Sequence, residues 1–188
     1  NLIPFADRLK EIKKTLPKFN KISFSTNIST KSLSENIIYL MEKSNEIFLE
    51  DAEFSLDIQF SLDGPSDFND CARIGSYSNE IVENIDTVLK EANKLEMKNN
   101  IFFSAKATHS KENIKRLSEY SELFSYFSFF DKAYEKWSES FDRYPNRAHT
   151  ITLVYPGKYT KEDGENYLRL LKNLEKIKFN IFEIIKNN

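Results

Sequence analysis

The chain has 188 residues, with 27 Lys and Arg against 29 Asp and Glu, and 40% of its residues are hydrophobic. This composition supplies enough apolar side chains for a folded core and excludes a disordered protein. The near balance of charge gives neither the basic field that nucleic-acid binding needs nor a polybasic membrane patch, so we expect no nucleic acid and no membrane among its partners.

Cysteine content and apolar run lengths indicate the compartment. Cys71 is the only cysteine, so no disulfide forms within the chain, and a reducing, cytoplasmic location is expected. The longest apolar runs are far shorter than the ~18 residues of a membrane span. The amphipathic, charged start shows no signal peptide and no initiator Met, so we expect the sequence to be an excerpt or a processed product.

The first half of the chain alternates predicted helices and strands. Apolar spacings of three and four predict a helix over 5–16, with a stripe of Phe5, Leu9, Ile12 and Leu16. Alternation of apolar and serine residues predicts a strand over 21–27. A second helix is expected over 32–45, with Ser32 or Ser34 as its N-cap.

The same alternation continues to the end of the chain. A strand is predicted over 54–63, followed by a long helix over 78–98 with a stripe of Ile81, Ile85, Val88, Leu89 and Leu95. The third strand is expected over 100–109, with Ser110 capping a helix after it. The aromatic segment 121–143 is ambiguous between helix and strand. The last predicted elements are a strand at 149–156, a Thr-capped helix with an acidic first turn at 160–177, and a strand at 178–185.

This order of elements predicts an α/β fold of βα units with a parallel sheet, in one domain over 1–188. The strands at 21–27, 54–62, 100–107 and 149–155 are expected to be parallel and adjacent in sequence order. Ligands bind at the carboxyl ends of such strands. The residues to inspect are therefore 25–27, 61–64, 107–109 and 154–156.

Three of these strand ends carry motifs. The second strand runs into Ser61-Leu62-Asp63-Gly64-Pro65, with Asp70 and Arg73 downstream; the first ends in Thr26-Asn27-Ile28; and the third leads to Thr108 and Glu112-Asn113. Together they resemble the radical S-adenosylmethionine enzymes, in the peptide-modifying and sulfatase-maturase branch whose members often carry a SPASM-type auxiliary-cluster domain. The resemblance covers roughly residues 5–177.

Two departures from the family pattern stand out. The family ends its strand with Thr-Asn-Gly, whereas this chain has Ile28 in place of the glycine. The family also binds a [4Fe–4S] cluster through CxxxCxxC, and Cys71 alone cannot do so. We therefore expect no metal site in this chain, and a cluster-binding segment upstream of it in the full-length protein.

The resemblance implies a partial (β/α)6 TIM-like barrel, of which this chain supplies strands three to six plus the C-terminal strand. It also implies S-adenosyl-L-methionine as cofactor and a [4Fe–4S] cluster in the full-length protein only. The implied activity is hydrogen abstraction from a peptide or protein substrate by a 5′-deoxyadenosyl radical. The alternative is a non-catalytic binding or scaffold protein on a degenerate barrel without the cluster. An unrelated α/β domain with chance motif likeness also stays open.

Five residues are assigned to cofactor binding by the resemblance: Ser61, Asp63, Arg73, Ser25 and Asn27. The Asp63 carboxylate suits a ribose diol, and the planar Arg73 guanidinium suits the cofactor carboxylate. Alternatives remain for three of them: turn chemistry for Asp63-Gly64, a salt bridge from Arg73 to Asp67 or Asp70, and, for Asn27, a turn role, which we favour.

Lys106, Thr108 and His109 are expected to contact substrate, because they end the third strand. His109 could carry a proton, since the unperturbed pKa of a histidine lies near neutrality, although a surface histidine beside Ser110 is the alternative we favour. We expect structural roles for Cys71, for His149 at the start of its strand, and for the aromatic cluster around Phe127.

Overall fold

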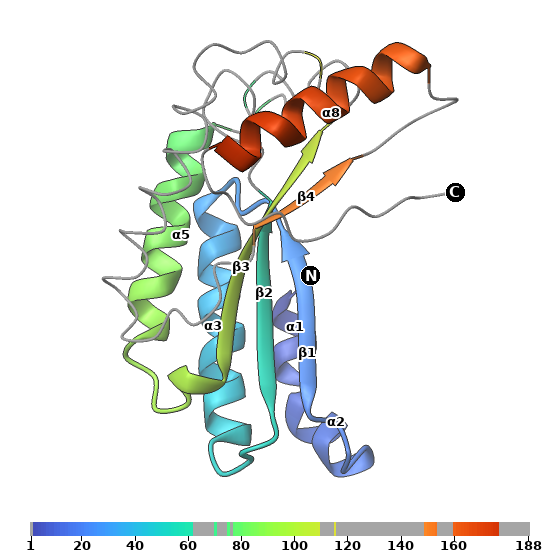
Figure 1. The fold of residues 1–188 in the computed structure, drawn as a ribbon. Helices are drawn as coiled ribbons and strands as arrows, with labels where there is room; N and C mark the ends of the chain where they lie inside the picture. Colours follow the sequence, from blue (N-terminus) through green and yellow to red (C-terminus); the bar gives the residue numbers. More distant parts are fainter. Residues whose placement is uncertain are drawn as a thin grey trace.

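The computed structural model describes residues 2–61, 70, 75, 77–109, 115, 149–153 and 160–176. These residues form an α/β structure (Figure 1). Its elements are α1 (Leu2–Asp7), α2 (Leu9–Thr15), β1 (Lys21–Thr26), α3 (Lys31–Phe48), β2 (Ser55–Ser61), α5 (Ser78–Ala92), η1 (Lys98–Asn100), β3 (Ile101–His109), β4 (His149–Leu153) and α8 (Lys161–Lys176).

The described strands form one parallel sheet in the order β1-β2-β3-β4, which confirms the predicted direction and sequential order. Ile22 pairs with Leu56, which in turn pairs with Ile101. β4 joins the carboxyl-terminal half of β3, where Ala105 pairs with His149. Within the described residues β1 and β4 are the two edges, and the sheet is not closed into a barrel.

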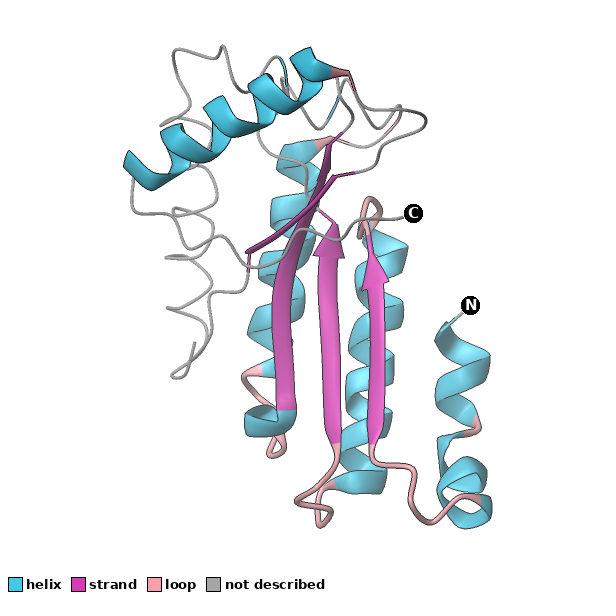
Figure 2. Ribbon diagram, turned by 45° about the vertical axis from the view of Figure 1, so that its right-hand side comes forward, coloured by secondary structure: helices cyan, strands magenta, loops and turns pink. Residues whose placement is uncertain are grey.

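One face of the sheet is covered by helices. Figure 2 shows α3 and α5 behind the strands, and α1 packs beside α3 in the same layer. β2 alternates strictly, so Leu56, Ile58 and Phe60 are buried while the residues between them are half-buried. Phe60 stacks on Phe103 of the next strand with ring centroids 5.6 Å apart. The hydrophobic core therefore lies between the sheet and this single helix layer.

The predicted helix over 5–16 is wrong in detail, because the chain forms two helices that meet at Arg8. The Arg8 N–H donates to the Phe5 carbonyl, three residues back, and this tight turn ends α1. Leu9 is fully buried as predicted, but Leu16 is 57% exposed and not part of the core.

Two further boundaries differ from the predictions. Neither Ser32 nor Ser34 caps α3: its N-cap is Thr30, whose extended backbone lets its hydroxyl accept from the Leu33 N–H. The helix predicted over 78–98 ends at Ala92. After Asn93 the chain forms turns in which a backbone N–H donates to the carbonyl three residues earlier. The Asn45 side chain of α3 accepts the Met97 N–H at 3.0 Å.

The start of α8 agrees with its prediction. Thr160 caps this helix in a reciprocal arrangement with Asp163, and Glu162 and Asp163 occupy the first turn. The Ser110 cap, the aromatic segment 121–143, the end of the fourth strand at 154–156 and the strand at 178–185 lie outside the described residues. In the described part of the chain, no helix is long and apolar enough to cross a membrane.

Candidate functional site

The face of the sheet opposite the helices is polar. By strand alternation and register it carries Lys21, Ser23 and Ser25 of β1, Ser55, Asp57, Gln59 and Ser61 of β2, and Phe102 of β3. The three β1 residues are exposed and the four β2 residues are half-buried. We call this set the polar face.

Two side-chain pairs bridge β1 and β2 on the polar face. Near the amino ends of the strands, the Lys21 ammonium lies 2.5 Å from the Asp57 carboxylate. Toward the carboxyl ends, the Ser25 hydroxyl donates to Gln59 Oε1 at 2.9 Å. Charge is thus paired at one end, whereas the other end presents neutral hydroxyl and amide groups that donate and accept hydrogen bonds.

A polar face is uncommon for a parallel sheet. Parallel strands are usually buried on both sides and are apolar along their length, as in doubly wound folds. Here the alternation in β1 and β2 leaves apolar side chains for one helix layer only. The sequence of these strands therefore suits a sheet whose second face borders a polar cavity or a ligand.

The predicted residues Ser25 and Ser61 both belong to the polar face. Ser25 pairs in register with Gln59, two residues before Ser61, so both lie toward the carboxyl ends of neighbouring strands. Asn27 follows the last residue of β1 and is half-buried. The structure thus brings these three predicted residues to one end of the sheet, while their assignment to a cofactor stays a prediction.

Other predicted residues are described less completely. Asp63, Arg73, Asp67 and Cys71 lie outside the described residues. The backbones of Lys106, Thr108 and His109 belong to β3, as predicted. Lys106 is in register with Ser61. The proposed contacts of these β3 residues with substrate stay predictions.

The turn after β1 has an unusual backbone. Ile28, which replaces the glycine of the resembled motif, has φ of +43°, in the left-handed region that glycine favours. Its N–H donates to Thr26 Oγ1 at 3.1 Å, and its carbonyl accepts from Asn84 Nδ2 of α5 at 3.0 Å. The chain therefore keeps a glycine-like turn at this strand end without the glycine.

The connection from β2 to α5 is anchored at its far end. Asp70 Oδ1 accepts from both the backbone N–H and the hydroxyl of Ser78, at 2.9 and 2.8 Å. Gly75 between them has φ of +80°, which glycine adopts without strain. Asp70 therefore satisfies a backbone N–H at the start of α5, whereas the sequence indicated it as a member of the motif and as one of two alternative partners for Arg73.

We expect Asp70→Ala to lower the free energy of unfolding by about 0.5–2 kcal/mol, the range for loss of a side chain that caps a helix start. Asp70→Asn keeps an oxygen acceptor and should lose less. Urea denaturation of both variants measures the difference. Equal stability of Asp70→Ala and the parent would show that this cap does not form in solution.

Sequence reasoning missed two residues near these strand ends. Gln59 occupies a position of the polar face by alternation, and that periodicity is the signal that could have identified it. Asn84 lies on α5, 56 residues from the carbonyl that it contacts, and nothing in its local sequence points to Ile28. Only the packing of α5 against the sheet brings the two together.

Among the described residues, shifted pKa values occur on α3 and in the turn that follows α3. The pKa of Asp51 is lowered because Lys13 donates a hydrogen bond to it. The pKa of Tyr39 is raised by its hydrogen bond to Asp7. Both pairs join α3 or the residues after it to α1–α2, so they act in packing these helices together.

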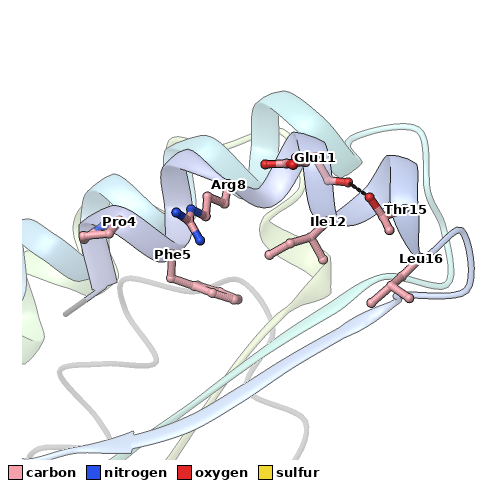
Figure 3. Close-up of a pocket in the computed structure, with 7 residues that line it drawn as sticks. All are labelled: Pro4, Phe5, Arg8, Glu11, Ile12, Thr15 and Leu16. Carbon is pink, nitrogen blue, oxygen red and sulfur yellow. Dashed lines mark hydrogen bonds between the residues drawn. The ribbon is translucent and has the colours of Figure 1, made fainter.

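A groove runs along α1 and α2 on the helix layer (Figure 3), with a volume of about 550 Å³. It is lined by Pro4, Phe5, Arg8, Glu11, Ile12, Thr15 and Leu16. The Thr15 hydroxyl is used locally, since it donates to the Glu11 carbonyl at 2.8 Å. We place the candidate site on the polar face because hydrogen-bonding groups from two strands converge there.

Within the described ranges, no group of three or more His, Cys, Asp or Glu side chains is arranged to bind a metal ion. No protein-family model matches the chain, and neither does any curated protein. We therefore infer function from the polar face, the strand ends and the motifs.

Proposed function

We propose that the chain is the central part of a radical S-adenosylmethionine enzyme that acts on a peptide or protein substrate. Its sheet would be part of a partial (β/α)6 barrel in which β1 to β4 are strands three to six. The observation that carries this proposal is the polar face of a parallel sheet that has an apolar core on its other side only. This polar face extends to the strand ends, where the family-like motifs lie.

The described residues fit the polar cofactor better than they fit a metal cluster. Ser25, Gln59 and Ser61 offer neutral donors and acceptors that suit ribose hydroxyls and amide groups. A [4Fe–4S] cluster takes several thiolates, whereas the chain contains Cys71 alone. The residues of this chain therefore do not fit the cluster, which other residues of the full-length protein would have to hold.

When bound, the cofactor together with a cluster held elsewhere would supply the radical chemistry. The role of this chain is to bind and orient. Asp63 would accept hydrogen bonds from a ribose diol, and Arg73 would pair with the cofactor carboxylate. Lys106 and Thr108 would contact the substrate along β3. The helix layer would shield the site from water on the outer side.

The glycine-like turn at Ile28 adds support. The resembled family has Thr-Asn-Gly where this chain has Thr26-Asn27-Ile28, and the backbone at Ile28 has the positive φ that a glycine would adopt there. A backbone of this kind costs free energy in a β-branched residue and is common near functional sites.

The single cysteine favours a second candidate. A barrel that has lost its cluster would act as a binding or scaffold protein for a polypeptide, using the same polar face. The two candidates differ in whether the full-length protein holds iron and sulfide and cleaves S-adenosylmethionine. Reconstitution of the full-length protein followed by iron analysis and assay of cofactor cleavage separates them.

We expect Arg73→Lys and Asp63→Ala each to weaken S-adenosylmethionine binding by about 1–3 kcal/mol, the range for losing a charge-assisted hydrogen bond. Calorimetric titration of the full-length protein measures this, with Arg169→Lys, a change at an exposed position of α8, as control. Thermal melting is recorded alongside. Variants that bind normally but melt well below the parent would show that Asp63 and Arg73 have structural roles. The likeness to the family motif would then be accidental.

A further inference from the structure

The turn after β1 holds a strained residue in place through three separate contacts. Ile28 has φ of +43°, a conformation that β-branched residues rarely adopt. Its side chain is fully buried, Thr26 Oγ1 accepts its N–H, and Asn84 Nδ2 donates to its carbonyl. Such a conformation persists only where the surroundings over-determine it.

The two hydrogen bonds differ in the sequence separation of their partners. The Thr26 contact is local, because Thr26 ends the same strand and lies two residues away. The Asn84 contact is long-range and fixes the turn to α5. The end of β1 is itself paired with β2, and Asn84 ties the turn that follows it to α5.

The same helix also anchors the connection after β2. Ser78 in the first turn of α5 donates twice to Asp70, and Asn84 lies six residues further on. At a rise of about 1.5 Å per residue, these two anchors are about 9 Å apart along the helix axis. One helix thus contacts both the turn after β1 and Asp70 in the connection after β2.

We propose that Asn84 is a positioning residue, which holds Ile28 in its left-handed conformation so that Asn27 is presented in a fixed orientation at the end of β1. The identity of the ligand in this inference rests on the proposed function. The contact by which Asn84 holds the turn does not depend on that function. Asn84 itself contacts the turn and is not assigned to the ligand. Its amide N–H is the donor that makes this contact.

The hold on the turn is tested by amide hydrogen exchange of the full-length protein. Asn84→Leu keeps the side-chain volume and removes the donor, and Asn84→Asp provides a second variant that also lacks it. Both should speed exchange in 26–30 on the order of tenfold, since local opening then needs less free energy. The control is Val88→Ala, a buried change on the same helix that lowers overall stability and leaves the Asn84 amide in place.

Exchange in 26–30 that rises no more in the Asn84 variants than in Val88→Ala would overturn the inference, because Asn84 would then act only through general stability. The second readout is calorimetric titration with S-adenosylmethionine. Asn84→Leu should raise Kd by roughly five- to tenfold, as expected when a preorganised contact becomes mobile, and Val88→Ala should stay within about twofold.

The outcomes separate the two proposals. A loosened turn with unchanged S-adenosylmethionine affinity would refute the positioning role and leave the proposed function standing. A full-length parent that does not bind S-adenosylmethionine would refute the proposed function and, with it, the ligand part of this inference. Hydrogen exchange would still decide whether Asn84 holds the turn.

Discussion

Phe60→Ala is expected to lower the free energy of unfolding by about 3–5 kcal/mol, the range for removing a buried aromatic side chain. Phe60 is fully buried on β2, faces the helix layer and stacks on Phe103. Its removal leaves a cavity between the sheet and the helices that these rigid elements fill only in part. Urea denaturation at neutral pH measures the change.

The matched control is Phe102→Ala, which removes the same side chain from the other face of the sheet. Phe102 is 47% exposed and belongs to the polar face, so its loss should cost less than about 1 kcal/mol. If Phe102→Ala were as damaging as Phe60→Ala, the second face would be covered by a core of its own. The polar face could then not border a ligand site, and the proposed function would lose its main support.

Much of the sheet could be predicted because its signal is local and regular. Ser55 to Ser61 alternate strictly between polar and apolar residues, and each strand is separated from the next by a helix-length segment. This pattern determines both the parallel direction and the one-sided core. The same pattern placed Ser25 and Ser61 at the carboxyl ends of their strands, where the structure has them.

The start of α3 and the end of α5 could not be predicted, since they depend on single hydrogen bonds. Thr30 rather than a serine caps α3 because its backbone is extended at that point. The apolar stripe in 78–98 continues past Ala92 in the sequence, yet Asn45 from another helix holds Met97 in a turn. Periodicity indicates which residues are apolar, but it does not indicate contacts from residues that are distant in the sequence.

In the candidate site, too, local sequence patterns could be read from the sequence, whereas contacts between distant residues could not. The motif at 61–65 pointed to the carboxyl ends of the strands, and the glycine missing from Thr26-Asn27-Ile28 was a departure from the family pattern. The structure shows a departure in residue type only, because the backbone at Ile28 is glycine-like. Asn84 contacts this turn from α5, and that contact depends on tertiary packing that no local pattern records.

Substitutions at Ile28 are expected to show an inverted order of stability. Ile28 is fully buried, so Ile28→Ala should cost about 2–5 kcal/mol through lost burial and the resulting cavity. Glycine normally costs a further 0.5–1 kcal/mol, roughly, because it loses more backbone freedom on folding than alanine. At a positive φ the alanine is strained instead, whereas glycine is not.

We therefore expect Ile28→Gly to be at least as stable as Ile28→Ala, and more stable by about 0.5–1 kcal/mol where the backbone strain is fully relieved. Ile85→Ala and Ile85→Gly form the matched pair, since Ile85 is equally buried but lies in the helix α5, where glycine should be worse by about 1 kcal/mol. Urea denaturation of the four variants gives both differences. If glycine proved worse than alanine by the same amount at both positions, Ile28 would not be held in the left-handed region, and the turn would lose its likeness to Thr-Asn-Gly.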